Sequence, residues 1–173
     1  MPEVDVLGRY LEKTFGVREA TFSCWATETS FAHDDPKTFK NLPMPKKHSF
    51  VSLGLELNAF DSYMVRRGVI PHQMEDKWFM YCTGNSIHMR RSWTGYLVYE
   101  IKFDLRGDGM YLQQLLINRN TKQYSGTDDN FDKALALFLL KTFLLRLPSQ
   151  YPTKEDTENQ ALEVWSQIGS GPG

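Results

Sequence analysis

Residues 90–96 hold the side chains best suited to bind an anionic ligand. The planar guanidinium of arginine fits a phosphate or a carboxylate, and this run begins with two arginines. Its tryptophan and tyrosine offer flat rings for a base, and its serine and threonine add hydroxyl groups. The candidate ligand-binding residues of the run are Arg90, Arg91, Ser92, Trp93, Thr94 and Tyr96. Together these residue types favour a nucleotide-like anion.

A second polar cluster follows the last predicted strand and leads into a helix predicted to begin near residue 129. Its candidate ligand-binding residues are Asn118, Arg119, Tyr124 and Asp128. The free N–H groups at a helix N-terminus can hold an anion. Asp128 and Asp129 partly oppose this, because their carboxylates would occupy the same position. The alternative is a plain helix cap and loop without a ligand.

Proton-transfer chemistry has four candidate residues in this chain. They are His88, Glu100, Asp128 and Asp129, with an arginine to stabilise developing negative charge. The sequence lacks the GxSxG, HExxH, P-loop and GxGxxG patterns, so no catalytic role is assigned. Its four histidines lack metal-ligand spacing and its two cysteines form no CxxC pair, so we predict neither a metal site nor a cofactor.

The pleat of a strand decides which side chains of residues 87–94 share a surface. Strict alternation from Ile87 places Arg90 on one face and Arg91 on the opposite, apolar face. Either a bulge redirects Arg91 or its burial requires an acidic partner. Gly95 favours a bulge or a close approach of a ligand to the backbone. The alternative for the whole run is a structural bulge with Trp93 in the core and the arginines paired with carboxylates.

Hydrophobic periodicity predicts an α+β fold. Strands are predicted at 19–26, 78–82, 87–91, 96–105 and 110–117, and helices at 4–15, 55–67, 129–147 and 158–168. Residues 50–57 fit either a strand or the start of the second helix. Turn signals at 83–86 and 106–109 join the later strands into an antiparallel β-meander. We expect this meander to pack against a long buried C-terminal helix and N-terminal helices, in a single domain 1–168 with a disordered tail 169–173.

The amino-acid composition argues against two classes of partner, duplex DNA and membranes. The 173 residues include 41% apolar and 24% charged side chains, and the formal net charge is -1. This balance argues against a dedicated duplex-DNA binder, which needs a net basic surface. The sequence shows no secretory signal and no apolar run of membrane-spanning length, so we expect a cytoplasmic protein without a membrane partner. Cys24 and Cys82 lie in apolar runs, where buried free thiols are expected, although a disulfide is the alternative.

Several short motifs resemble a known family. They are Lys77-Trp78-Phe79-x-Tyr81, Arg91-Ser92-Trp93-Thr94-Gly95-Tyr96 with Tyr99, Asn118-Arg119, Gln123-Tyr124, and Thr127-Asp128-Asp129 with Asp132. This pattern, within residues 77–140, resembles a family of small microbial proteins associated with macrodomain proteins and with ADP-ribose or NAD-linked systems. The resemblance implies a nucleotide-linked role without a particular activity. In the family pattern a histidine precedes the Arg-Ser-Trp-Thr-Gly run; here Arg90 takes that position, so His88 would have to substitute as a general base.

Three functions are consistent with these observations. The first is a binding module for an ADP-ribose-like or other nucleotide ligand, with phosphate held by arginines and the base stacked on aromatic rings. The second is a hydrolase or transferase that acts on an NAD- or ADP-ribose-derived nucleotide. The third is a protein-interaction domain without a small-molecule site, in which the aromatic residues and the basic residues 46–48 form a partner surface.

Overall fold

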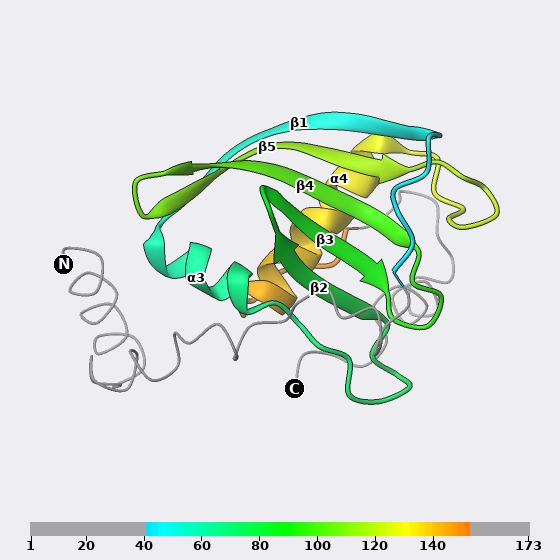
Figure 1. Ribbon diagram of the computed structural model, residues 1–173, viewed down its shortest axis with the longest axis horizontal. Coiled ribbons are helices and arrows are strands. Elements are labelled where there is room, and N and C mark those ends of the chain that lie inside the picture. Colours follow the sequence, from blue (N-terminus) through cyan, green and yellow to red (C-terminus); the bar gives the residue numbers. More distant parts are fainter. Residues whose placement is uncertain (1–40, 153–173) are drawn as a thin grey trace.

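The computed structural model describes residues 41–152, which form a five-stranded antiparallel sheet with helices packed against it (Figure 1). The strand order is β1-β5-β4-β3-β2. The α+β class and the antiparallel meander are therefore confirmed. The predicted helices at 4–15 and 158–168, the strand at 19–26 and the tail at 169–173 lie outside the described residues.

The described elements are joined by short turns at the two hairpins and by ten-residue segments before β2 and after β5. They are β1 (His48–Leu57), α3 (Ala59–Arg67), β2 (Trp78–Thr83), β3 (Ser86–Arg91), β4 (Leu97–Arg106), β5 (Gly109–Asn118), α4 (Asp129–Leu139) and a π-helical segment (Leu140–Leu144). Each of β3, β4 and β5 pairs with the strand before it, and β1 adds to the free side of β5. None of the helices within residues 41–152 is long and apolar enough to cross a bilayer.

Both predicted hairpin turns are present. Gly84 and Gly107 adopt positive φ angles of 56° and 60°, a backbone conformation that costs glycine little and other residues more. The β2–β3 and β4–β5 hairpins therefore close where the sequence places turn residues.

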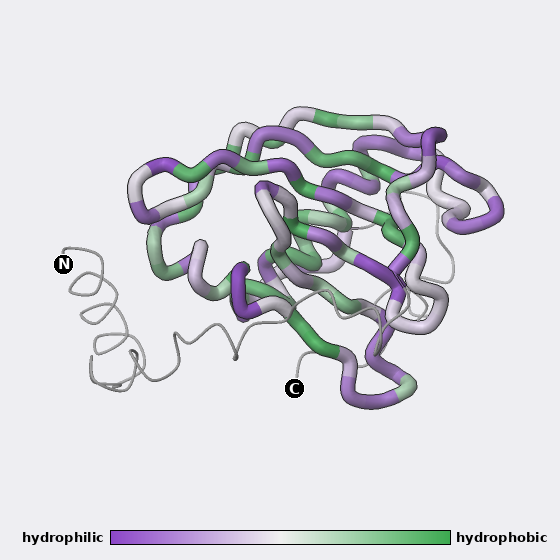
Figure 2. The backbone as a smooth tube through the Cα atoms, in the orientation of Figure 1, coloured by the Kyte–Doolittle hydropathy of each residue, from purple (hydrophilic) through white to green (hydrophobic). Residues whose placement is uncertain are grey.

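The core lies between one face of the sheet and α4. Tyr99, Ile101 and Leu115 of the sheet are fully buried, as are Leu135 and Leu139 of α4. The alternation of hydrophobic and hydrophilic residues along the strands is visible in Figure 2. Burying each large apolar side chain contributes about 1.5–3 kcal/mol, so this face supplies much of the stability of the fold.

The prediction that a helix begins at residue 55 is wrong. Leu55 and Leu57 continue β1, and they pair with Leu112 and Met110 of β5. α3 begins only at Ala59, after Asn58, whose side chain accepts a hydrogen bond from the N–H of Asp61 at 2.8 Å. The alternating burial of β1 shows the two-residue period of a strand, so cross-strand pairing outweighs the helical spacing of the following residues.

α4 begins where the sequence predicts. Asp128 caps it, with its side chain accepting from the N–H groups of Asn130 and Phe131. The α-helical hydrogen bonding stops at Leu139 and becomes π-helical from Leu140 to Leu144, so the described α-helix is shorter than the predicted 129–147. One side of α4 is open to solvent, because Ala134 is exposed.

Candidate functional site at one end of the sheet

Four connecting segments meet at one end of the sheet, which we call the loop end (Figure 1). They are residues 41–47 before β1, 69–77 before β2, 92–96 between β3 and β4, and 119–128 after β5. Backbone hydrogen bonds link them in pairs: Leu42 N to Gly95 O (3.2 Å), Ser92 N to Lys77 O (3.0 Å) and Arg119 N to Lys47 O (2.9 Å). The sequence-predicted ligand-binding residues therefore lie on or near a single end of the molecule.

The Arg90 side chain stabilises the fold through hydrogen bonds to its own chain. Its side chain is buried, and its Nε donates to the hydroxyl of Tyr81 at 2.7 Å. Its Nη1 donates to the carbonyls of Leu42 and Gly95. The guanidinium thus links residues 41–47 to the turn after β3, and its Nε and Nη1 donors are used within the protein.

Arg91 lies on the core side of the sheet, as the alternation predicts. Its guanidinium carbon is 4.4 Å from the centre of the Trp78 ring, a cation–π contact. Burial lowers the pKa of Arg91, while the nearby hydroxyls of Tyr124 and Tyr99 act in the opposite direction. The pairing of β3 with β4 shifts register between Met89 and Arg90, but this irregularity does not redirect Arg91 to the other face of the sheet.

Arg119 belongs to a partly buried ionic network, in which Asp132 is buried and Asp129 is partly exposed. Its Nη1 lies 2.7 Å from Oδ2 of Asp132, its Nη2 binds Asp129, and its Nε donates to Oγ of Ser49 at 3.2 Å. Asp132 is completely buried, and its Oδ1 accepts from Tyr99 and Tyr124. Burial acts to lower the pKa of Arg119, but the hydrogen bonds to Asp129 and Asp132 outweigh it and raise that pKa.

The remaining residues of this second cluster also serve the fold. Asn118 is fully buried, and its Nδ2 donates to Leu97 O (2.8 Å) and to Oε1 of Gln123 (2.9 Å). Asp128 caps α4, as described above. Tyr124 is buried and donates to the carboxylate of Asp132. The alternative of a helix cap and loop therefore describes these contacts better than an open anion site.

The four proton-transfer candidates fall into two separate groups of contacts. His88 and Glu100 are cross-strand partners in β3 and β4. Asp128 and Asp129 lie at the start of α4. The structure therefore brings His88 and Glu100 together, and it places the two aspartates with Arg119 and the helix cap.

The group around Glu100 forms a line of polar side chains across β3 and β4. Lys102 Nζ pairs with Oε1 of Glu100 and lies 2.8 Å from Oγ of Ser86. The ring of His88 stacks on that of Tyr81, with centres 5.0 Å apart. Burial acts to raise the pKa of Glu100, but hydrogen bonds from Lys102 and Ser86 outweigh it, so the net shift is downward. The lowered pKa keeps Glu100 ionised at neutral pH, so it holds no proton to donate as a general acid there.

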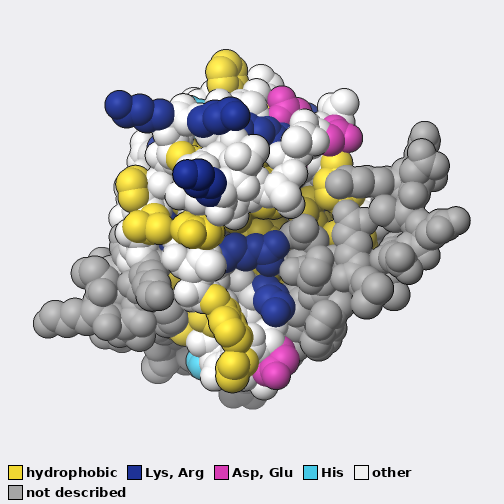
Figure 3. Space-filling model, turned by 90° about the vertical axis from the view of Figure 1, so that its right-hand side faces the viewer, with side chains coloured by type: hydrophobic (Ala, Val, Ile, Leu, Met, Phe, Trp, Pro, Cys, Tyr) yellow, Lys and Arg dark blue, Asp and Glu magenta, His cyan; other side chains and the backbone are white. Residues whose placement is uncertain are grey.

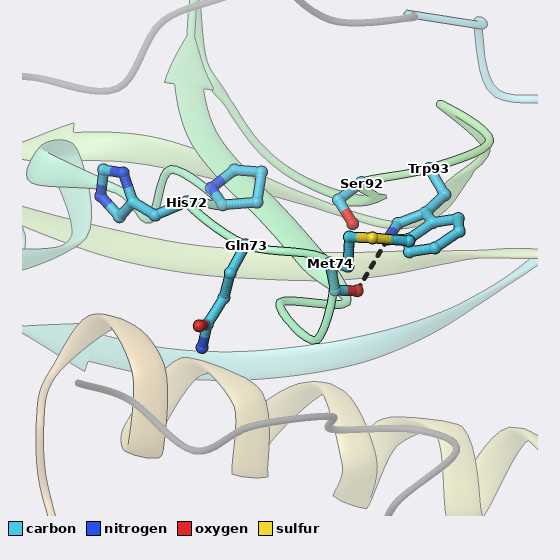
Figure 4. Close-up of a pocket in the computed structure, with 6 residues that line it drawn as sticks. His72, Gln73, Met74, Ser92 and Trp93 are labelled. Atoms are coloured by element: carbon cyan, nitrogen blue, oxygen red, sulfur yellow. Dashed lines mark hydrogen bonds between the residues drawn. The ribbon is translucent and has the colours of Figure 1, made fainter.

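A shallow hollow of about 440 Å³, wide open to solvent, lies at the loop end and is lined by Pro71, His72, Gln73, Met74, Ser92 and Trp93 (Figure 4). The Trp93 side chain is 53% exposed, so the alternative that places Trp93 in the core is wrong. Its Nε1 donates to Met74 O at 2.9 Å, which fixes the orientation of the ring. Lys77 Nζ lies 5.8 Å from the ring centre.

Ser92 and Trp93 are the two predicted residues that line this hollow. Ser92 Oγ donates to Asp76 O at 2.5 Å, so it also anchors the segment before β2. The sequence pattern did not indicate His72 and Met74 as residues of the hollow, nor Lys77 as a neighbour of Trp93. No local signal marks residues 69–77 as part of the site, because their position depends on long-range hydrogen bonds to the turn after β3.

Lysine side chains surround the loop end. Lys46 and Lys47 precede β1, Lys122 lies in the segment after β5, and all three are exposed. Figure 3 views this end of the molecule, and there Lys and Arg side chains gather beside hydrophobic ones, with acidic side chains toward the edges. Within residues 41–152, no three His, Cys, Asp or Glu side chains group as metal ligands would.

Comparisons with family models, curated proteins and solved structures found no match to this chain. The function proposed below therefore rests on the geometry of the described residues.

Proposed function

We propose that this chain is a binding module for a nucleotide-like ligand whose base stacks on Trp93. The observation that carries the proposal is a half-exposed indole whose orientation is fixed by a hydrogen bond to Met74 and which borders a hollow. Stacking a base on such a ring is worth about 1–3 kcal/mol by alanine substitution. ADP-ribose and NAD are the ligands that the family resemblance favours.

The sequence suggested that arginines hold the phosphate of the ligand. We propose instead that a lysine makes this contact. Arg90 and Arg119 spend their donors on carbonyls, hydroxyls and carboxylates of their own chain. Lys77, beside the Trp93 ring, is the cation nearest to a stacked base among the contacts described. A single flexible ammonium gives a weaker and less directional phosphate contact than an arginine fork, so we expect modest affinity for mononucleotides.

Binding is favoured over catalysis by the state of three of the four proton-transfer candidates. Glu100 is held by Lys102, Asp129 by Arg119, and Asp128 by the first turn of α4. A general acid or base needs a pKa near the working pH, and the pKa values of Glu100 and Asp129 are shifted downward instead. Ligand recovered intact after long incubation with concentrated protein would agree with the binding role, and steady turnover would favour the hydrolase or transferase.

The test is calorimetric titration with NAD, ADP-ribose and a cyclic nucleotide. We expect binding by at least one of them, weakened roughly 5- to 150-fold in Trp93→Ala and largely retained in Trp93→Phe. Phe50→Ala is the matched control, because Phe50 is an aromatic side chain that is 67% exposed on β1 and outside the hollow. Absence of binding by every nucleotide at millimolar concentration would overturn the proposal.

A protein-interaction domain is the second candidate, and one observation favours it. Leu42, Met74 and Trp93 are exposed hydrophobic residues of the loop-end segments, and Ile70 lies in the same segment as Met74. An apolar cluster with a basic margin fits the composition of many partner surfaces. A negative nucleotide screen together with a peptide ligand that Met74→Ala or Trp93→Ala weakens would establish this alternative.

A further inference from the structure

Within the part of the chain that the structure describes, the lysines at the loop end form no ion pair, unlike Lys102 and Arg119. Arg90, Arg91 and Arg119 are engaged by carbonyls, rings or carboxylates, and Lys102 pairs with Glu100. By contrast, no ion pair within residues 41–152 involves Lys46, Lys47, Lys77 or Lys122. The same segments also carry Glu75, Asp76 and Asp128, but none of these carboxylates forms an ion pair with the four lysines within the described residues, so the lysines stay available to an anionic ligand at the end that carries the Trp93 hollow.

These lysines are spread across the width of the sheet rather than gathered at one point. Lys46 and Lys47 lie at the start of β1, Lys122 follows β5, and Lys77 precedes β2. The strand order places β1 and β2 at opposite edges of the sheet, four inter-strand spacings apart. At about 4.8 Å a spacing, the row extends over roughly 19 Å. That span suits an extended polyanion better than a single phosphate group.

We propose that the loop end binds a segment of single-stranded nucleic acid, with one base on Trp93 and the phosphates along Lys77, Lys122 and Lys46-Lys47. This inference rests on the proposed function of the hollow, and it extends that site from a mononucleotide to a chain. The combination of a basic track with an exposed aromatic ring is the arrangement by which proteins bind single strands without sequence preference. The size of the row corresponds to the lower end of such sites, about four nucleotides.

A duplex and an acidic peptide fit these observations less well. Bases in a duplex are already stacked and paired, so they leave Trp93 without a partner. An acidic peptide would use the lysines but has no need of a flat ring whose orientation is fixed. An exposed indole beside the row of lysines therefore favours a ligand with an unpaired base, as in a single strand.

The experiment is fluorescence anisotropy with a labelled eight-nucleotide oligothymidine, measured between 50 and 200 mM salt. Each phosphate neutralised contributes a slope of about -0.7 to log K against log[salt], so four lysines give about -3. The triple variant Lys46→Gln/Lys47→Gln/Lys122→Gln should bind more weakly and lose about 2 from the magnitude of that slope. Lys141→Gln, at an exposed lysine in the π-helical segment, is the control and should leave affinity and slope unchanged.

The outcomes separate this inference from the proposed function. Oligothymidine binding that depends on both Trp93 and the three lysines, with mononucleotide binding kept in the triple variant, supports it. Mononucleotide binding without oligothymidine binding overturns the inference and leaves the proposed function intact. If the chain binds neither oligothymidine nor mononucleotides, both the inference and the proposed function are overturned. Equal or tighter binding of a labelled oligoglutamate or of the matching duplex also overturns the inference. Unchanged thermal unfolding of the triple variant shows that a loss of binding is not a loss of fold.

Discussion

Individual charged residues at the loop end divide into those that hold the fold and those that face solvent. Arginine's several donors let one side chain satisfy several groups at once, and Arg90 and Arg119 both do this. Asp132 is the centre of the second network, because its two oxygens receive two tyrosine hydroxyls and a guanidinium. These residues fix the position of the segments that carry the candidate site without offering free donors to a ligand.

Asp132→Asn tests this structural role. The substitution removes the buried carboxylate that pairs with Arg119, while the pair of Arg119 with Asp129 remains, so we expect a loss of about 1.5–3 kcal/mol of unfolding free energy. Tyr124→Phe removes only one hydroxyl donor and should cost about 1 kcal/mol. Both are measured by urea denaturation. Asp104→Asn, at an exposed carboxylate of β4, is the control and should stay within about 0.5 kcal/mol. A loss below 1 kcal/mol for Asp132→Asn would contradict the network as described.

At the scale of elements, the start of α4 distinguishes a helix cap from a ligand site. Asp128 accepts from two N–H groups of the first turn, so Asp128→Ala should cost about 1 kcal/mol of unfolding free energy, and Asp128→Asn much less. Neither substitution should change nucleotide affinity. Thermal unfolding and calorimetry on the same samples check both statements. A large loss of nucleotide affinity in Asp128→Asn, with the fold unchanged, would show that Asp128 contacts the ligand.

Elements set by local chemistry were predictable from the sequence, and those set by long-range pairing were less so. The two hairpins follow from glycines at turn positions, and the caps of α3 and α4 follow from Gly68 and Asp128. The sequence did not predict that Leu55 and Leu57 belong to a strand, because this depends on pairing with residues more than fifty positions later. The end of α-helical hydrogen bonding at Leu139 has no sequence signal either, since the apolar pattern continues beyond it.

At the scale of the whole molecule, the position of the candidate site was predictable but its chemistry was only partly so. Residues 90–96 do lie at the loop end, and Trp93 and Ser92 do line a hollow. The arginines were assigned to a ligand because residue type alone does not reveal their partners. Arg90 is held by a carbonyl 48 positions away, and Arg119 by Ser49, 70 positions away. Only the folded chain brings these groups together. The sequence therefore could not show that, within the described residues, the lysines of the loop end form no ion pair.

The stability of the whole fold should depend on pH at both ends of the scale, through groups of both polar networks. The pKa of Asp129 is lowered by hydrogen bonds from Arg119 and Ser49, and that of Glu100 is also lowered. In the opposite direction, burial raises the pKa of Tyr99 and of Tyr124. The first pair therefore limits stability in acid, and the second pair limits it in alkali.

The thermal midpoint should consequently form a plateau between about pH 5 and pH 10. Carboxylates with lowered pKa values stabilise the fold above their unfolded values, near pH 4, and this contribution is lost as the pH falls through the folded values. Tyrosines with raised pKa values ionise first in the unfolded chain, so stability falls as the pH rises past about 10. Scanning calorimetry from pH 3 to 11 measures both limbs. Glu100→Gln should flatten the acid limb, and Tyr99→Phe the alkaline one. Asp61, whose pKa is raised by burial, acts in the opposite direction on the acid limb. A midpoint that rises as the pH drops from 5 to 3 in the Asp61→Asn variant would therefore contradict the ion pairs of Glu100 and Asp129.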